Sequence, residues 1–297
     1  MTPQALYHHG SRAVQDLVGV RESADHVGRS VGDGIRPVVA AFLEQRPMLV
    51  IGGADPAGAV WASLLTGEPG FVRATGPHQI SVAGGPLRTD PLASTLAAEG
   101  ARVGTIALDP RTRRRVRLNG RARPTPRGLA IETDQVFSNC PKYIQKREPL
   151  PGAIPGSPSE PRRGAKLTGE QRAFLAGADT FFLATVHPHG ADASHRGGNP
   201  GFVQVPSPGE ITWRDYPGNS MFLSLGNLAT DPRAGLLFLD WRTGSTLQLT
   251  GTARTDHADD GTRTVRFTLS EAVETPGASP WSWTAPEYSA ANPGQED

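Results

Sequence analysis

The run Ser194, His195, Arg196, Gly197 and Gly198 combines residue types that recognise phosphate. A planar guanidinium offers paired charged hydrogen bonds, and a serine hydroxyl adds another donor. The two glycines let backbone amides approach an anion closely. We therefore predict an anion site here, with Arg196 as its leading contact. The alternative is a surface arginine in a glycine turn.

His187, His189 and His195 lie close together, so metal or haem ligation is a second interpretation of the same region. The sequence His-Pro-His-Gly is equally typical of a turn, and nothing in the spacing places a third or fourth zinc ligand. We predict no metal site, and haem ligation stays open as an alternative. Cys140 is expected to be an inert thiol rather than a nucleophile.

Arginines between Arg113 and Arg123 could attract nucleic acid or an anionic cofactor tail. No aromatic residues interleave with them for base stacking, and the net charge of the chain is only +1. We therefore predict no nucleic-acid partner. The apolar runs are far shorter than the roughly 20 residues that span a bilayer, and a single cysteine fits a reducing compartment, so we expect a soluble, cytoplasmic protein without a membrane partner.

The elements that position these residues come from an internal repeat. Residues 62–123 align with residues 193–254 at a constant shift of 131, with 22 identities in 62 positions. A Pro-rich segment, residues 148–166, separates the copies and suits an extended linker. We predict an N-terminal repeat with leading helices over residues 1–147 and a C-terminal repeat with a C-terminal tail over residues 167–297.

Each copy is expected to begin with a short helix and an apolar strand. The helices are predicted near residues 36–45 and 169–176, the second opened by a capping box of Thr168 and Gln171, and the strands near 48–51 and 181–186. In the best-aligned ribbons, residues 115–123 and 246–254, apolar and polar residues alternate, which predicts one buried and one polar face. With 35 glycines and 27 prolines, short strands and turns indicate a small barrel in each copy.

Two runs carry a family resemblance: HPHGADASHRGGNPGFVQV and DYPGNSMFLSLGNLATDPRAGLLFLDWRTGSTLQLTG. They resemble the flavin-binding split-barrel proteins related to pyridoxamine 5'-phosphate oxidase, and the repeat resembles the tandem branch of that family. The resemblance implies a mainly β fold with flanking helices, built as two tandem six-stranded antiparallel split barrels that form a pseudo-dimer. It also implies that a pseudo-twofold axis relates the two barrels and that FMN binds in the cleft between them.

The two copies differ where one of them could hold a ligand. Copy one has leucines at positions 64 and 65, where copy two has His195 and Arg196. Polar groups buried without partners cost roughly 1–3 kcal/mol each, so a polar ligand such as a phosphate and ribityl chain should satisfy them. The predicted cofactor-binding residues of copy two are Ser194, His195, Arg196, Gly197, Asn219, Ser220, Ser224, Asn227, Trp241 and Gln248. The alternatives are a turn for Asn219, a helix cap for Asn227 and core packing for Trp241.

Copy one adds a segment without a counterpart in copy two, residues 138–145. We expect Asn139, Lys142 and Tyr143 to cross the pseudo-dimer cleft and complete the site, with Lys142 supplying a second positive charge. The alternative for Lys142 is a solvated surface position.

The sequence thus predicts an FMN-dependent oxidoreductase acting on a small organic substrate, a flavoprotein of the pyridoxamine 5'-phosphate oxidase-like kind, present as a monomeric pseudo-dimer or as a homodimer. No glycine-rich dinucleotide fingerprint, Gly-x-Ser-x-Gly elbow or carboxylate pair is present. NADH or NADPH would therefore act as a diffusing co-substrate. The alternative is a non-catalytic flavin- or haem-binding split barrel for cofactor storage, transport or sensing. No catalytic residue can be assigned.

Overall fold

The computed structural model describes residues 6–152 and 158–294. The first sheet comprises β1 (Met48–Ala54), β2 (Val60–Thr66), β3 (Val72–Gly76), β4 (Gln79–Ala83), β5 (Ala101–Asp109), β6 (Arg114–Thr125) and β7 (Gly128–Ser138). The second comprises β9 (Thr180–His187), β10 (Gly190–Gly197), β11 (Val203–Ser207), β12 (Glu210–Arg214), β13 (Arg233–Leu239), β14 (Thr246–His257) and β15 (Arg263–Thr275), with the short β8 (Arg162–Gly164) paired to β15.

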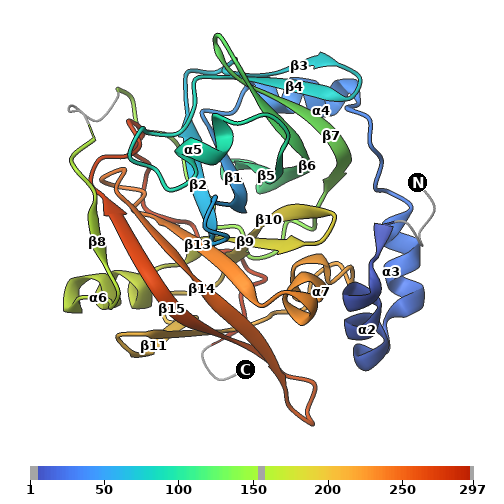
Figure 1. Cartoon of the computed structure of the whole chain (residues 1–297). Helices are drawn as coiled ribbons and strands as arrows, with labels where there is room; N and C mark the ends of the chain where they lie inside the picture. Colours follow the sequence, from blue (N-terminus) through green and yellow to red (C-terminus); the bar gives the residue numbers. More distant parts are fainter. Residues whose placement is uncertain (1–5, 153–157, 295–297) are drawn as a thin grey trace.

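The two sheets have the same topology, which confirms the internal repeat. The strand order is β2-β1-β5-β6-β7-β4-β3 in the first and β10-β9-β13-β14-β15-β12-β11 in the second, and all pairs are antiparallel. In Figure 1 the first sheet lies above the second, and strands β9 and β10 of the second sheet lie in the middle of the view. The mainly β class with flanking helices is confirmed, and the arrangement fits two tandem split barrels. Each path has seven strands rather than six, because the short strands β3 and β11 pair onto its edge.

In the described parts of the chain the sheets are flanked by helices α2 (His9–Val18), α3 (Arg21–Gly28), α4 (Pro37–Glu44), α5 (Ala93–Leu96), α6 (Gly169–Gly177) and α7 (Leu223–Thr230). The helices predicted before each first strand are confirmed as α4 and α6. The Thr168–Gln171 capping box opens α6 as predicted. Helix α2 packs on α7 beside the second sheet (Figure 1), so the N-terminal helices of the chain support repeat two.

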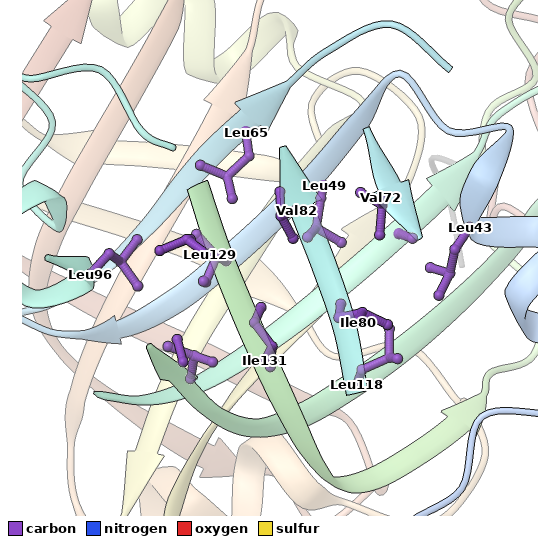
Figure 2. Close-up of a cluster of buried hydrophobic side chains, with 14 of the residues drawn as sticks. Leu43, Leu49, Leu65, Val72, Ile80, Val82, Leu96, Leu118, Leu129 and Ile131 are labelled. Carbon is purple, nitrogen blue, oxygen red and sulfur yellow. The ribbon is translucent and has the colours of Figure 1, made fainter. Parts of the chain in front are cut away.

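Each repeat has its own core, and a third core joins them. Figure 2 shows the first, where side chains such as Leu49, Ile80 and Leu118 converge from different strands. The second gathers around Phe181 and Phe238. The third combines residues of both repeats, including Val50 and Leu237, so the repeats share a buried interface.

Reciprocal close contacts reveal the pseudo-twofold axis between the repeats. A Cβ on Gly104 would lie 2.4 Å from the backbone of Asp192, and a Cβ on Gly235 would lie 2.6 Å from the backbone of Trp61. Both pairs are related by the shift of 131. Because glycine alone allows such an approach, β5 packs on β10 as β13 packs on β2.

The linker prediction needs a correction. Residues 153–157 lie outside the described residues, but β8, at the end of the predicted linker, pairs with β15 through Glu274, Val273 and Ala272. Backbone groups at positions 148–150 also bond to the C-terminal segment. The backbone of β8 can pair because its three residues, Arg-Arg-Gly, include no proline. Over the described parts of the chain, no helix has the length and apolarity needed to cross a membrane.

Candidate functional site

A cleft lies between the repeats and gathers most of the predicted site residues. Its walls come from the end of β10 and residues 214–225 of repeat two, and from β6 and the loop 139–143 of repeat one. Ten predicted residues line it: Asn139, Lys142, Tyr143, Ser194, His195, Arg196, Gly197, Asn219, Ser220 and Ser224. The expectation that residues 139–143 of copy one face copy two therefore agrees with the geometry.

Arg115, on β6 of repeat one, fixes the state of His195. Its guanidinium donates to Nδ1 of His195 at 2.8 Å and to the Cys140 carbonyl at 2.7 Å. Because a guanidinium can only donate, Nδ1 accepts and the proton of neutral His195 lies on Nε2. Burial, with Arg115 and Arg196 nearby, holds the pKa of His195 well below 6.5. His195 is thus a neutral donor whose buried Nε2 has no partner among the described residues.

Arg117, which lines the cleft, forms a buried ion pair with Asp192. The Asp192 carboxylate also accepts from Asn119 Nδ2 at 3.1 Å and from the Ser224 hydroxyl at 2.9 Å. The Ser224 hydroxyl lies 3.1 Å from that of Ser194. This network crosses the repeat interface and holds both serine hydroxyls in place.

Arg196 and Arg263 share one carboxylate, that of Asp215. Two carboxylates, those of Asp192 and Asp215, thus pair with three guanidinium groups around the cleft, those of Arg117, Arg196 and Arg263. Arg115 adds a fourth, which has no ion-pair partner within the described residues. The excess positive charge in a largely buried place favours an anionic ligand.

Tyr143 and Tyr216 stand together at the cleft, with ring centroids 5.2 Å apart. The Tyr143 hydroxyl donates to the Pro217 carbonyl at 2.8 Å, which ties the two repeats together here. Tyr143, Ser220 and Phe222 all have positive φ, between 52° and 66°, a conformation that costs energy outside glycine. With these loops in place the cavity volume is about 110 Å³. Pockets for drug-sized ligands measure roughly 300 Å³ or more, so the volume enclosed here suits an anionic group rather than a complete cofactor.

Three predicted residues lie outside the cleft because their side chains are engaged elsewhere. Trp241 packs edge-on against Trp283, with ring centroids 5.6 Å apart, so the core-packing alternative describes it. Asn227 bonds to His8 at 2.8 Å and to Thr185 at 2.9 Å. Gln248 donates to the Ala62 carbonyl at 3.0 Å within repeat one.

Gln248 marks the position that the pseudo-twofold axis relates to the cleft. It also donates to Ser63 at 3.1 Å and to Asp90 at 3.0 Å, while the Ser63 hydroxyl donates to Asp90 at 2.6 Å. Burial raises the pKa of Asp90, which these hydrogen bonds oppose. Where the cleft has excess positive charge, its counterpart is thus closed by a satisfied network around a carboxyl group.

His187 and His189, the other two histidines of the predicted cluster, lie away from the cleft. The His187 ring stacks on that of His8, with centroids 5.1 Å apart, and burial, with His8 next in effect, lowers the pKa of His187 to about 4. His189 lies in the turn after β9, whereas His187 is the last residue of that strand. Over residues 6–152 and 158–294, no group of three His, Cys, Asp or Glu side chains is arranged to hold a metal ion.

The sequence prediction missed several residues of the cleft. Arg115 and Arg117 were noted only as part of the basic stretch, and Asp215 and Tyr216 were not singled out. For the two arginines the sequence did hold a signal. A twofold axis brings strand β6 of repeat one to the site in repeat two, so Arg117, and not its aligned partner Gln248, should have been assigned to that site. The predicted polar face of β6 is consequently split, since Arg117 is buried while Arg121 is exposed.

The family comparison concerns the repeat that carries most of these residues. Residues 167–275 match the pyridoxamine 5'-phosphate oxidase family. The match includes β9 to β15 and the Ser194–Gly197 run, and it leaves out repeat one. No curated protein matches the chain.

Several solved structures are similar to parts of the chain at low identity. The FAD-binding protein from Mycobacterium smegmatis is 12% identical, with 39% of this chain and 98% of that chain covered and a TM-score of 0.28. A NimC/NimA family protein from Clostridium acetobutylicum is 15% identical, with 40% and 95% covered and a TM-score of 0.29. HupZ from Group A Streptococcus is 9% identical, with 35% and 90% covered and a TM-score of 0.29.

Proposed function

We propose that the cleft binds FMN and that the protein is a flavin-dependent oxidoreductase acting on a small organic molecule. The observation that carries the proposal is Arg115, a guanidinium in the repeat interface without an ion-pair partner among the described residues, beside the unpartnered Nε2–H of His195. The family match over residues 167–275 supports a flavin as the anionic ligand.

The side chains of the cleft suit the phosphate end of FMN. Arg115 and Arg196 supply positive charge, and His195 supplies a neutral donor with a fixed tautomer. Ser194 and Ser224 add hydroxyls whose positions the Asp192 network maintains. Charged hydrogen bonds to a phosphate contribute about 1.5–3 kcal/mol each, so two of them amount to an affinity gain on the order of 100-fold or more.

A bound flavin supplies hydride or electron transfer, and the residues of this chain bind it, orient it and limit the access of water. Tyr143 and Tyr216 are suited to the last role, because they meet across the cleft. Burial raises the pKa of both tyrosines above the ordinary value of 10.0. Their hydroxyls therefore stay protonated and act as donors at neutral pH.

Titration of the purified apoprotein with FMN, FAD and riboflavin tests the proposal. Riboflavin lacks the phosphate, so FMN should bind about 100-fold more tightly when flavin fluorescence quenching is measured. Saturation should occur at one flavin per chain, since the symmetry-related position is closed around Asp90. Equal affinity for FMN and riboflavin would remove the phosphate role from these arginines.

The same experiment separates the oxidoreductase from its alternatives. A protein that takes up FMN should have its flavin bleached by NADH or NADPH under anaerobic conditions and restored by oxygen. Flavin binding without any reduction would indicate a carrier, and a Soret band after addition of haemin without flavin uptake would indicate a haem protein. Absence of binding by all these ligands would refute the proposal.

A further inference from the structure

The C-terminal segment of repeat two fastens the end of repeat one. Backbone bonds of 2.9 Å join Lys146 and Glu287 in both directions, and further bonds of 2.9 Å join Leu150 to Ser282 and Thr284 to Glu148. Residues 282–287 thus pair with residues 146–150, which closely follow the cleft loop 139–143.

Gln145 connects this segment to the cleft. It is 1% exposed, and its Nε2 donates to the Tyr143 carbonyl at 3.1 Å and to the Gly198 carbonyl at 3.2 Å. Its Oε1 accepts from the Ser289 amide at 2.8 Å and from Asn292 Nδ2 at 3.0 Å. One buried amide therefore joins the cleft loop, the end of β10 and the C-terminal segment.

A second set of bonds supports the same arrangement from the other side. Asn292 donates to the Asn199 side chain at 2.9 Å, and Asn199 donates to the Pro293 carbonyl at 3.2 Å. Arg113 donates to the Ile144 carbonyl at 3.0 Å and to the Glu287 carboxylate at 3.1 Å. The base of the cleft loop is thus tied to residues 287–293 through both side chains and backbone.

The loop needs this support because Tyr143 is held at φ 66°, which the surroundings must stabilise. We propose that Gln145 is a positioning residue and that residues 288–294 complete the ligand site by fixing the loop that carries Asn139, Lys142 and Tyr143 into the cleft. The proposal rests on the proposed function for the identity of the ligand, FMN. Its structural part concerns the loop alone.

Cys140, the one cysteine of the chain, lies on this loop and reports on it directly. A chain ending at Glu287 should be alkylated by iodoacetamide at Cys140 about tenfold faster than the wild type, by mass spectrometry, because the loop loses its anchor. FMN should bind about tenfold more weakly, while the melting temperature changes little. A chain ending at Gly294 keeps every bond described above and should behave as the wild type.

The Asn292→Ala variant covers the case in which truncation prevents folding, because it removes only side-chain bonds to Gln145 and Asn199. Faster alkylation in either variant supports the inference. Wild-type alkylation and wild-type FMN affinity in both variants, or in Asn292→Ala when the truncated chain does not fold, would overturn it. Failure of the wild type to bind FMN would refute the proposed function, and the alkylation rates would still decide the role of the segment.

Discussion

Replacing Arg115 by methionine separates binding from folding at this site. Burial lowers the pKa of Arg115 to about 10, well below that of a free guanidinium, and Arg196 adds to the effect. The difference corresponds to about 3 kcal/mol against the charged form in the protein without ligand. Part of the Arg115 side chain remains accessible to solvent. Screening by water therefore reduces the cost of the charge to roughly 1–2 kcal/mol.

Methionine retains much of the aliphatic volume and removes the charge. It also removes the hydrogen bonds to His195 and to the Cys140 carbonyl, which contribute about 1 kcal/mol each. The gain and the loss nearly cancel, so the free energy of unfolding without ligand should change by less than about 1 kcal/mol. FMN affinity should fall at least about tenfold, because the phosphate loses the charged hydrogen bonding of Arg115 while Arg196 remains.

Urea unfolding followed by tryptophan fluorescence gives the stability, and flavin fluorescence quenching gives the affinity. Arg121→Met is the matched control, since Arg121 lies on the same strand with its side chain exposed. The control should retain wild-type FMN affinity. An Arg115→Met protein that binds FMN within about threefold of the wild type would refute the assignment, and a loss above about 3 kcal/mol in stability would show a structural role instead.

Three further predictions concern single positions. Gly197→Ala should lower the free energy of unfolding in urea by about 2–4 kcal/mol, because its Cβ would lie 2.1 Å from the Tyr143 carbonyl oxygen. Gly218→Ala is the control and should leave that free energy unchanged, because its Cβ would meet nothing within 4 Å. The pKa of His187, about 4 against an ordinary 6.5, means that its stabilising contribution is complete above pH 6.5 and is lost as the pH falls towards 4. Between about pH 7 and pH 4.5 the free energy of unfolding should therefore fall by about 1–2 kcal/mol less in His187→Gln than in the wild type. Urea unfolding at both pH values measures this difference. Trp241→Phe should leave FMN affinity within about twofold in the quenching titration, since Trp241 packs on Trp283 outside the cleft.

The repeat could be found in the sequence because both copies keep the turn and core residues that the fold needs. Gly104 and Gly235 illustrate this, since each one permits close contact with the other repeat. The strand order then follows identically in both sheets. The linker was harder to predict, because a three-residue strand such as β8 has no periodicity and depends on the edge offered by β15.

The candidate site was predictable where its residues follow one another along the chain, as Ser194 to Gly197 do. It was mispredicted where residues meet through symmetry. Gln248 was assigned to the site of its own repeat, but the pseudo-twofold axis brings each ribbon to the opposite repeat. Arg117 therefore reaches Asp192, a contact that no local pattern could indicate.

Fusion of the two repeats allows the two symmetry-related positions to diverge, so that one is a cleft lined with arginines while its counterpart is filled by side chains. In a homodimer a substitution appears at both symmetric positions, so an aspartate at the position of Asp90 would place a carboxyl group in both sites. In a single chain, Asp90 and Gln248 can fill one position while Arg115 and Arg117 charge the other. The filled position adds stability through satisfied hydrogen bonds, and the cleft retains excess positive charge that favours an anionic ligand. The proposed function therefore predicts a stoichiometry of one ligand per chain.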